Sequence, residues 1–209
     1  MTSKTAVRPV DAAGLVLLRE SRRGFEVLLG RRHAKAGFLP DIYVFPGGRV
    51  EAADGAGPSL RLAPAVAAEL ARATGKPAEA FVRAALRETA EETGLALAGE
   101  AMATVDFVCR AITPTYSRRR YNTRFLMADG AYAEGQLSGD GELEDLAWRS
   151  VTALDGLPIV DVTAFVLAEA IARRLRKLPP GAEPAVRFSY VGDTARIFRR
   201  PWVVSQFEK

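Results

Sequence analysis

Apolar residues near the start of the chain occur in short runs, a spacing that is typical of strands rather than helices. Residues 12–18 and residues 26–29 are two such runs, and the polar segment 19–24 between them ends in a glycine. Two apolar runs joined by a polar, glycine-ended turn predict a β-hairpin. The chain is therefore expected to begin with two antiparallel strands.

Further apolar runs predict the rest of a sheet. Residues 42–45 lead into a tight turn that begins at Pro46 and contains Gly47 and Gly48. Because Gly48 has no side chain, its backbone can approach a metal ion or a phosphate closely. Strands are also expected at residues 102–112, 121–127 and 146–149.

Three segments have the composition and spacing of helices. The strongest is residues 77–95, where Pro77 suits a first helical turn and Gly94 stands where a helix commonly ends. Residues 162–175 form an amphipathic pattern with a basic end, as the helix dipole favours. An Ala/Leu-rich segment at residues 63–73 predicts a short extra helix.

The helix at 77–95 gathers carboxylates on one face. At 3.6 residues per turn, positions i, i+3 and i+4 lie together over a single turn, and here they are Glu88, Glu91 and Glu92. Such a cluster repels itself unless a positive charge joins it, and a hard divalent cation such as Mg²⁺ or Mn²⁺ prefers these oxygen ligands. The alternative is a solvated charged face, the usual interpretation of an isolated E-x-x-E-E.

The order of strands, helix, strands and helix indicates a single α/β domain over residues 1–209. Residues 1–10 are interpreted as an arm, residues 49–78 as an insertion and residues 179–209 as a C-terminal extension. The extension carries scattered aromatic residues that are expected to pack on the domain or on a second subunit. They are Phe188, Tyr190, Phe198, Trp202 and Phe207.

Composition narrows the chemistry and the location. A single cysteine, Cys109, excludes an intramolecular disulfide, and a single histidine, His33, makes a histidine-built metal site or a Ser-His-Asp triad improbable. The net charge of +4 and pI of 9.4 favour anionic ligands, but this charge is too mild to imply nucleic acid. The first apolar run is too short to span a membrane, so a cytoplasmic protein is expected.

The glycine turn and the acidic helix together resemble the Nudix box, Gly-x5-Glu-x7-Arg-Glu-U-x-Glu-Glu-x-Gly-U, where U is aliphatic. Residues 87–95 fit the pattern except at Thr89, a β-branched residue in an aliphatic position. Seven residues separate Glu79 from Arg87, as the pattern requires. However, 30 residues separate Gly48 from Glu79, where the pattern has five. We interpret the additional residues as an insertion before Glu79. The resemblance implies an α/β/α sandwich around a mixed sheet, with this helical insertion between the glycine turn and the catalytic helix.

Within the Nudix superfamily the chain is most similar to the peroxisomal and bacterial coenzyme A diphosphatase group. The similarity extends over roughly residues 11–175 and rests on several short matches. They are residues 44–51, the long insertion, residues 84–88, Thr113-Pro114, residues 120–125 and Trp148. The implied reaction is metal-dependent cleavage of coenzyme A or acyl-coenzyme A into 3′,5′-ADP and (acyl-)4′-phosphopantetheine.

The resemblance also assigns roles around the helix. Mg²⁺ or Mn²⁺ is expected on Glu88, Glu91, Glu92 and the Gly48 carbonyl, where it bridges phosphate oxygens and lowers the pKa of an attacking water. Glu91 or a loop acid is the candidate general base. Arg87 is expected to orient the carboxylates. The loop acids that could add a ligand or orient the water are Glu142 and Glu144.

Basic and aromatic residues elsewhere are candidates for substrate binding. Arg31 and Arg32 follow the second predicted strand and could form a basic rim for phosphates, although a solvated strand end explains them as well. Arg119, Arg120 and Tyr121 lie in a turn where arginines can bind phosphates and a ring can stack on a base. Arg119 or Arg120 would then meet the 3′-phosphate of coenzyme A.

Other functions remain open from the sequence alone. Within the same chemistry the substrate could be ADP-ribose, a dinucleoside polyphosphate or a capped RNA end. A non-catalytic nucleotide sensor is disfavoured by the complete carboxylate set, and a nucleic-acid-binding module is disfavoured by the modest charge. A homodimer is expected from the resemblance.

Overall fold

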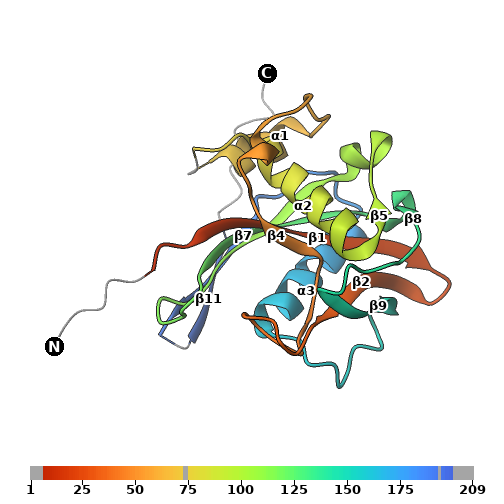
Figure 1. Ribbon diagram of the computed structural model, residues 1–209. Helices are drawn as coiled ribbons and strands as arrows, with labels where there is room; N and C mark the ends of the chain where they lie inside the picture. Colours follow the sequence, from red (N-terminus) through yellow and green to blue (C-terminus); the bar gives the residue numbers. More distant parts are fainter. Residues whose placement is uncertain (1–6, 73–74, 193, 200–209) are drawn as a thin grey trace.

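A nine-stranded mixed sheet forms the centre of the computed structural model, which describes residues 7–72, 75–192 and 194–199 (Figure 1). Its main path runs β11-β10-β6-β7-β1-β2-β3, with β4 paired to β1 and β9 paired to β2. The pairs β1·β7 and β10·β6 are parallel, and the other pairs are antiparallel. The strands are β1 Val10–Ser21, β2 Gly24–Arg32, β3 Tyr43–Val44, β4 Gly47–Arg49, β6 Asp106–Ile112, β7 Tyr121–Asp129, β9 Leu143–Ser150, β10 Val186–Val191 and β11 Thr194–Phe198.

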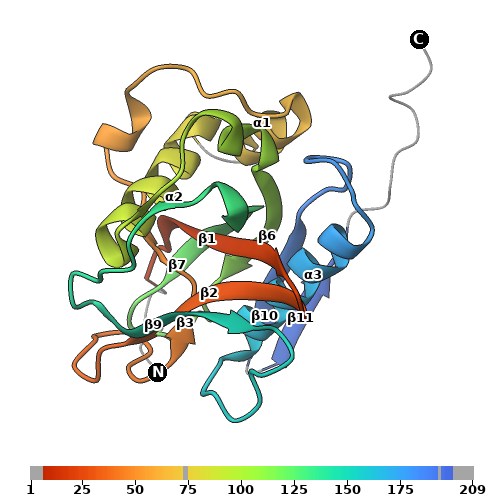
Figure 2. The same cartoon turned by 90° about the vertical axis from the view of Figure 1, so that its right-hand side faces the viewer.

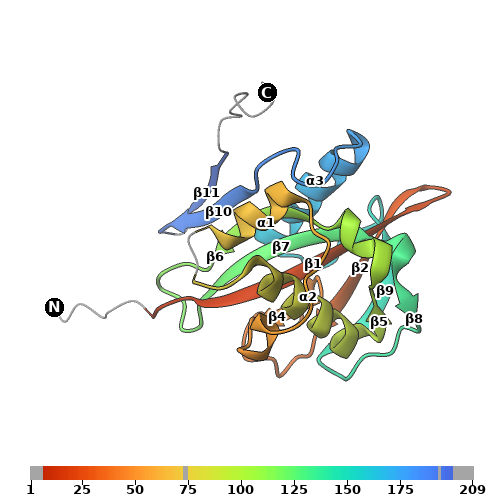
Figure 3. The same ribbon diagram turned by 90° about the horizontal axis from the view of Figure 1, so that it is seen from above.

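Helices cover both faces of this sheet (Figures 2 and 3). The helices α1 (Pro64–Ala71) and α2 (Ala78–Thr93) contribute to one buried apolar cluster, and α3 (Asp161–Leu175) contributes to the other. Side chains alternate between the two faces along each strand, so neighbouring residues of β1 such as Leu15 and Val16 belong to different clusters. The predicted α/β/α sandwich around a mixed sheet is confirmed.

The helix α2 has the boundaries that its sequence predicted. Pro77 is its N-cap residue, and Gly94 is its C-cap residue with a φ of 71°. A side chain at Gly94 would be strained by this left-handed backbone, and its Cβ would lie 2.5 Å from the Gln136 carbonyl oxygen. Glycine therefore lets the segment before β9 pack directly against the end of α2.

The extra helix predicted between the glycine turn and α2 is present as α1, two residues shorter at the C-terminal side than expected. It packs with α2 through Val66 and Leu70, both fully buried. A short 3-10 helix, η1 (Ala53–Gly55), lies before it. The inserted residues thus enlarge the α2 face of the sheet.

Three predicted boundaries were wrong. The hairpin turn is only Arg22 and Arg23, because the strands continue pairing as far as Ser21 and Gly24. The strand predicted from residue 102 begins at Asp106, since residues 99–104 form a 3-10 helix, η2. The extension was predicted only to pack, but it contains β10 and β11, which complete the sheet beside β6. Trp202 and Phe207 lie outside the described residues.

Two smaller elements complete the chain. A two-stranded sheet pairs β5 (Leu95–Ala96) with β8 (Glu134–Gly135), and the 3-10 helix η3 (Gly130–Tyr132) follows β7. None of the described helices combines the length and the apolar character that a membrane crossing requires.

Candidate active site on the acidic helix

Glu88 lies directly against the glycine turn. A Cβ built on Gly48 would fall 2.3 Å from Cδ and Oε1 of Glu88, so no other residue leaves this carboxylate where it is. Gly48 belongs to β4 and pairs with Ala13 of β1. Burial raises the pKa of Glu88 above its usual value, although the neighbouring Arg87 opposes this shift. The half-buried Glu88 carboxylate therefore packs against the backbone of Gly48.

Glu92 is the more deeply buried carboxylate of the helix, with 3% of its surface exposed. Its Oε2 accepts a hydrogen bond from the backbone N–H of Gly47 at 2.8 Å. Burial raises the pKa of Glu92 to about 8, and the charges of Glu88 and Glu142 act in the same direction. Two adjacent carboxylates that are costly to ionise form a site whose charge a cation would offset.

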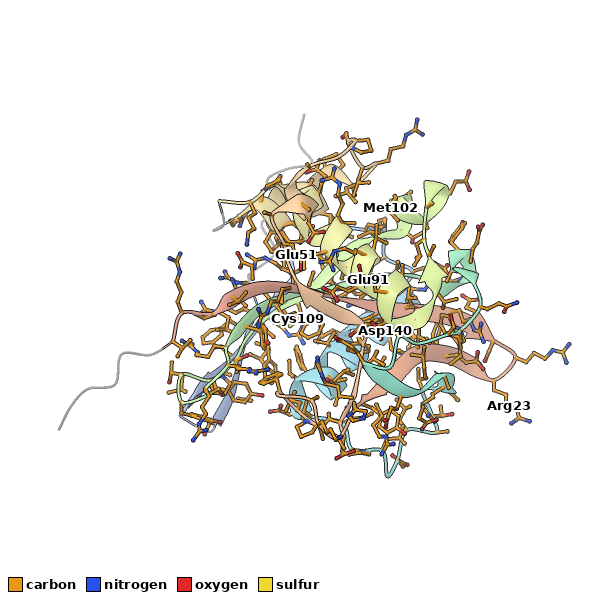
Figure 4. The ribbon with its side chains drawn as sticks, in the orientation of Figure 1. Arg23, Glu51, Glu91, Met102, Cys109 and Asp140 are labelled. Carbon is orange, nitrogen blue, oxygen red and sulfur yellow. The ribbon has the colours of Figure 1, made fainter. Side chains whose placement is uncertain are left out.

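Glu91 is more exposed than this pair and is linked to Glu88 through Arg87. Its side chain is 54% exposed and pairs with Arg87 at 3.1 Å. In Figure 4, Glu91 lies on α2 with Glu51 and Asp140 on either side of it in that view. Within the described residues no three acidic, histidine or cysteine side chains converge as a ready-made metal site. The buried carboxylates are thus Glu88 and Glu92.

Arg87 connects the acidic face to the insertion. Its Nε and one terminal nitrogen donate to the two carboxylate oxygens of Asp54, each at 3.2 Å. Its other nitrogen donates to Glu88 at 2.9 Å and to Glu91 at 3.1 Å, and the Arg49 carbonyl accepts a further bond. The Asp54 contact is the largest cause of a raised pKa at Arg87. This geometry fixes one guanidinium between the glycine turn and the carboxylates.

Asp54, rather than Glu79, is the acid that holds Arg87. Asp54 is buried, and it also accepts the backbone N–H of Glu51 at 2.8 Å. Glu79 makes no ion pair with Arg83 or Arg87; Arg83 instead donates to the Asp54 and Pro58 carbonyls. The assignment of Glu79 to the motif was therefore wrong.

The sequence contained a signal for Asp54. Five residues separate Gly48 from Asp54, which is the spacing that the motif gives its first acid. The match was overlooked because residue 54 is aspartate, whereas the motif has glutamate. Counting back from Arg87 across seven intervening residues instead gave Glu79, which is a glutamate. The extra residues therefore follow Asp54 instead of preceding it, and η1 holds Asp54 beneath Arg87.

The loop before β9 adds Glu142 to this region. The N–H of Ser138 donates to the Thr93 carbonyl at 3.0 Å, which packs the loop against the end of α2. The N–H of His33 donates to the Glu142 carbonyl at 3.2 Å. The Glu142 charge is close enough to raise the pKa of both Glu88 and Glu92, whereas Arg32 opposes that effect at Glu92. Glu142 and Arg32 thus border the buried carboxylates.

Glu144 and Arg31 are engaged with each other instead. They pair across β2 and β9 at 2.8 Å, and His33 and Asp41 add further contacts at 3.5 Å. Both side chains are part of a charged cluster at the end of β2. The structure therefore separates Glu144 from Glu142 and Arg31 from Arg32, although the sequence grouped them.

The remaining sequence candidates lie together on another part of the surface. Arg120 is occupied by the carbonyls of Thr113 and Val7, at 3.2 and 2.7 Å. The guanidinium of Arg119 covers Gly37, and the ring of Tyr121 packs edge-on against Phe38. These contacts place the loop after β6 against the loop after β2.

The donor set suits a hard cation. Glu88 and Glu92 offer oxygen atoms only, both carboxylates are partly or fully withdrawn from water, and a side chain at Gly48 would displace the Glu88 carboxylate. A sandwich of this topology, with a glycine turn under an acidic helix, defines a class of hydrolases that cleave phosphoanhydrides.

The family model described as NUDIX domain matches residues 8–168, and the chain belongs to the Nudix family. A NUDIX hydrolase from Alicyclobacillus acidocaldarius is 27% identical, with a TM-score of 0.60 over 79% of this chain and 92% of that one. The chain is accordingly a Nudix pyrophosphohydrolase acting on nucleoside diphosphate derivatives, and such enzymes generally use divalent metal ions.

More distant structures share the fold. The MutT protein from Bacillus halodurans is 14% identical, with a TM-score of 0.55 over 90% of this chain and 97% of that one. The NUDIX domain of Shewanella oneidensis NrtR, solved with ADP ribose, is 15% identical, with a TM-score of 0.53 over 80% and 90% of the two chains. A search of curated proteins gave no match.

Proposed function

We propose that this chain hydrolyses coenzyme A or acyl-coenzyme A to 3′,5′-ADP and (acyl-)4′-phosphopantetheine. Mg²⁺ or Mn²⁺ would be held by Glu88, Glu92 and the Gly48 carbonyl, and Glu91 would join after turning away from Arg87. The observation that carries this proposal is the buried Glu88–Glu92 pair on the glycine turn, whose raised pKa values a divalent cation would reverse. A bound cation supplies charge neutralisation at the diphosphate and acidifies a coordinated water.

The residues around the pair take distinct parts in this reaction. Arg87, fixed by Asp54, holds the Glu88 carboxylate in place. Arg32, whose charge opposes the raised pKa of Glu92, would contact a phosphate oxygen. Glu142 is exposed and its charge acts on Glu88 and Glu92, so it would be the loop group that takes a proton from the attacking water. Glu144 is a weaker candidate for that role because it is paired with Arg31.

Coenzyme A as the substrate is supported by charge outside the helix. Arg120 is occupied by two carbonyls, whereas Arg119 is exposed and lies on Gly37. Of the two arginines that the sequence proposed for the 3′-phosphate, Arg119 is therefore the one available. The remaining support is the sequence similarity to the coenzyme A diphosphatase group.

Product identification tests the proposal directly. The purified chain is incubated with coenzyme A, dephospho-coenzyme A, ADP-ribose and diadenosine polyphosphates, each with Mg²⁺, with Mn²⁺ and with a chelator. Mass spectrometry should find 3′,5′-ADP from coenzyme A, no turnover with the chelator, and a higher kcat/KM for coenzyme A than for dephospho-coenzyme A. A preference for ADP-ribose or for a dinucleoside polyphosphate would reject coenzyme A and retain the reaction class.

A further inference from the structure

Two aromatic side chains from distant segments meet beside the substrate candidates. Phe38 belongs to the loop between β2 and β3, and Tyr121 is the first residue of β7. Their ring centroids are 5.2 Å apart at an interplanar angle of 63°, and both side chains remain partly exposed. An edge-to-face pair leaves ring surface open on its solvent side, whereas a core pair would be covered.

The backbone of the Phe38 loop is held in an unusual shape. Leu39 and Asp41 have φ values of 50° and 57°, which non-glycine residues seldom adopt. The Asp41 carboxylate pairs with Arg31 at 3.5 Å, and the Asp41 N–H donates to the Arg32 carbonyl at 3.1 Å. Strained backbone that neighbouring structure holds in place, here the end of β2, occurs often at ligand clamps. The loop thus presents Phe38 on a fixed support instead of a mobile tip.

The two loops that carry the aromatic pair also carry positive charge. Arg119 lies against Gly37, next to Phe38. Lys35, Arg118 and Arg119 are exposed, and no carboxylate in the described part of the chain pairs with any of them. Aromatic rings bordered by unpaired cations match the two chemical halves of a nucleotide, a flat base and its phosphates.

The sheet places this pair within reach of the acidic helix. Tyr121 pairs with Val10, and Gly48 pairs with Ala13, so they are separated by two strand spacings and three residues, about 14 Å. Phe125 lies on the same side of β7 as Tyr121, which is the α3 side of the sheet, and its ring packs on Phe45 at 6.1 Å, just before the glycine turn. An extended nucleoside diphosphate could bridge such a separation.

We infer that Phe38 and Tyr121 form a stacking platform for the nucleobase of the substrate, and that Arg119 binds a phosphate of the same nucleotide. This inference rests on the proposed function, because it assigns the nucleotide half of the substrate to one place. It adds Phe38 and its loop to the binding site. Stacking accepts any flat base, so the platform favours nucleotides as a class and does not read base edges.

Binding measurements with two matched ligands test the platform without turnover. AMP and ribose 5-phosphate differ only in the base, and each is titrated calorimetrically into the whole chain with a chelator present. The unsubstituted chain should bind AMP more tightly. Phe38→Ala should weaken AMP binding about 10-fold to 100-fold, as expected for a lost stacking contact, and leave ribose 5-phosphate unchanged. Phe38→Trp should retain AMP binding.

Further variants separate base from phosphate contacts. Arg119→Ala should weaken both ligands by a similar factor. Tyr132→Ala removes an exposed aromatic residue just beyond the far end of β7 and should change neither. Equal affinity of the unsubstituted chain for AMP and ribose 5-phosphate would overturn the platform, and so would equal weakening of both ligands in Phe38→Ala.

The outcome is independent of the reaction. If AMP selectivity and its loss in Phe38→Ala are found but no diphosphate is hydrolysed with any divalent cation, the platform stands and the proposed function fails. If coenzyme A is hydrolysed but the base contributes nothing to binding, the proposed function stands and the platform fails.

Discussion

At the scale of single residues, the position of one carboxylate decides how the site is assembled. Arg87 reaches Asp54 with two nitrogens, and the same guanidinium touches Glu88 and Glu91. Removing the Asp54 charge would leave Arg87 free to turn toward the carboxylates that a cation needs. We therefore predict that Asp54 positions Arg87 and that Glu79, on the same helix as Arg87, does not.

The substitution Asp54→Asn should lower kcat about 10-fold to 100-fold, as is typical when a group that orients a metal ligand is lost. Glu79→Gln is the matched control, and it should retain full activity because Glu79 does not contact Arg87. Steady-state kinetics at saturating Mg²⁺ compare the two. A larger loss of kcat in Glu79→Gln than in Asp54→Asn would show that Glu79, and not Asp54, is the first acid of the motif.

Glu92 gives the cation-free protein a defined pH dependence. Burial raises its pKa from the ordinary 4.5 to about 8, so between these values the folded chain keeps a proton that the unfolded chain has released. The free energy of unfolding should therefore fall as the pH rises from about 4.5 to about 8. Glu92→Gln should flatten this profile, and added Mn²⁺ should stabilise the native chain more at pH 8 than at pH 6.

Chemical denaturation at several pH values, with and without a chelator, measures this effect. A chelated native chain whose unfolding free energy rises across that interval would contradict the burial of an unpaired Glu92. An identical slope in Glu92→Gln would assign the dependence to other groups.

From the sequence it was possible to predict which residue types form the site and which of them lie close together along one helix. Glu88, Glu91 and Glu92 were found from their helical spacing, but nothing local showed that Glu92 would be buried and Glu91 exposed. Burial depends on where the Gly47 backbone meets the helix, which is a contact between distant segments. Likewise, Arg31 and Arg32 look equivalent in sequence, yet a cross-strand partner engages only Arg31.

At the scale of elements, α2 crosses the sheet with a defined contact at each end. Near its start, Phe81 packs under the guanidinium of Arg124, whose carbon lies 4.0 Å from the ring centroid. Two turns later, Glu88 meets Gly48. Arg124, Ala13 and Gly48 occupy one row across β7, β1 and β4. The contact with the glycine turn thus determines how closely the acidic half of α2 lies to the sheet.

Substituting the two glycines should separate an effect on activity from an effect on folding. Gly48→Ala brings a methyl group onto the Glu88 carboxylate, a side-chain end that can shift, so kcat should fall at least 100-fold with little change in Tm. Gly47→Ala brings Cβ within 2.4 Å of the Ala13 carbonyl oxygen at a φ of 154°, so the fold should lose about 1 to 3 kcal/mol. Kinetics and thermal melting of both variants provide the measurement. Full activity in Gly48→Ala would show that the carboxylate is not needed where it lies.

The C-terminal end of α3 is attached to the sheet by a buried ion pair. Arg173 and Asp106 are 1% and 2% exposed and lie 2.6 Å apart, and Arg173 also donates to the carbonyls of Glu183 and Pro184. Asp106→Ala leaves a buried cation without its partner and should cost about 3 to 5 kcal/mol of unfolding free energy. Urea unfolding tests this value. A loss below 1 kcal/mol would show that water or another acid replaces Asp106.

Predictions of elements succeeded where the pattern was local. The Pro77 and Gly94 ends located α2, and the amphipathic pattern with its basic end located α3, each to within a residue or two. The strand β10 was missed although Val186, Phe188 and Tyr190 alternate with polar residues. Its place in the sheet depends on pairing with β6 about 80 residues earlier, and β11 pairs with β10 in turn. The start of β6 was placed four residues too early, because buried apolar residues of η2 such as Met102 look like a continuation of the strand.

At the scale of the whole molecule, the sheet connects two chemically different regions. The acidic helix and glycine turn supply carboxylates for a cation, and the loops around Phe38 and Tyr121 supply rings and unpaired positive charge. Opposite charges at the two regions suit a substrate whose diphosphate binds through a metal ion at one end and whose nucleotide is held at the other. The net charge of +4 is consistent with an anionic substrate.

Mn²⁺ binding followed by electron paramagnetic resonance tests the central claim most directly, because it requires neither a known substrate nor turnover. We predict that the native chain binds Mn²⁺, that Glu88→Gln and Glu92→Gln each weaken binding at least 10-fold, and that Glu79→Gln binds like the native chain. Unchanged Mn²⁺ affinity in both Glu88→Gln and Glu92→Gln would show that the cation lies elsewhere and would contradict the account.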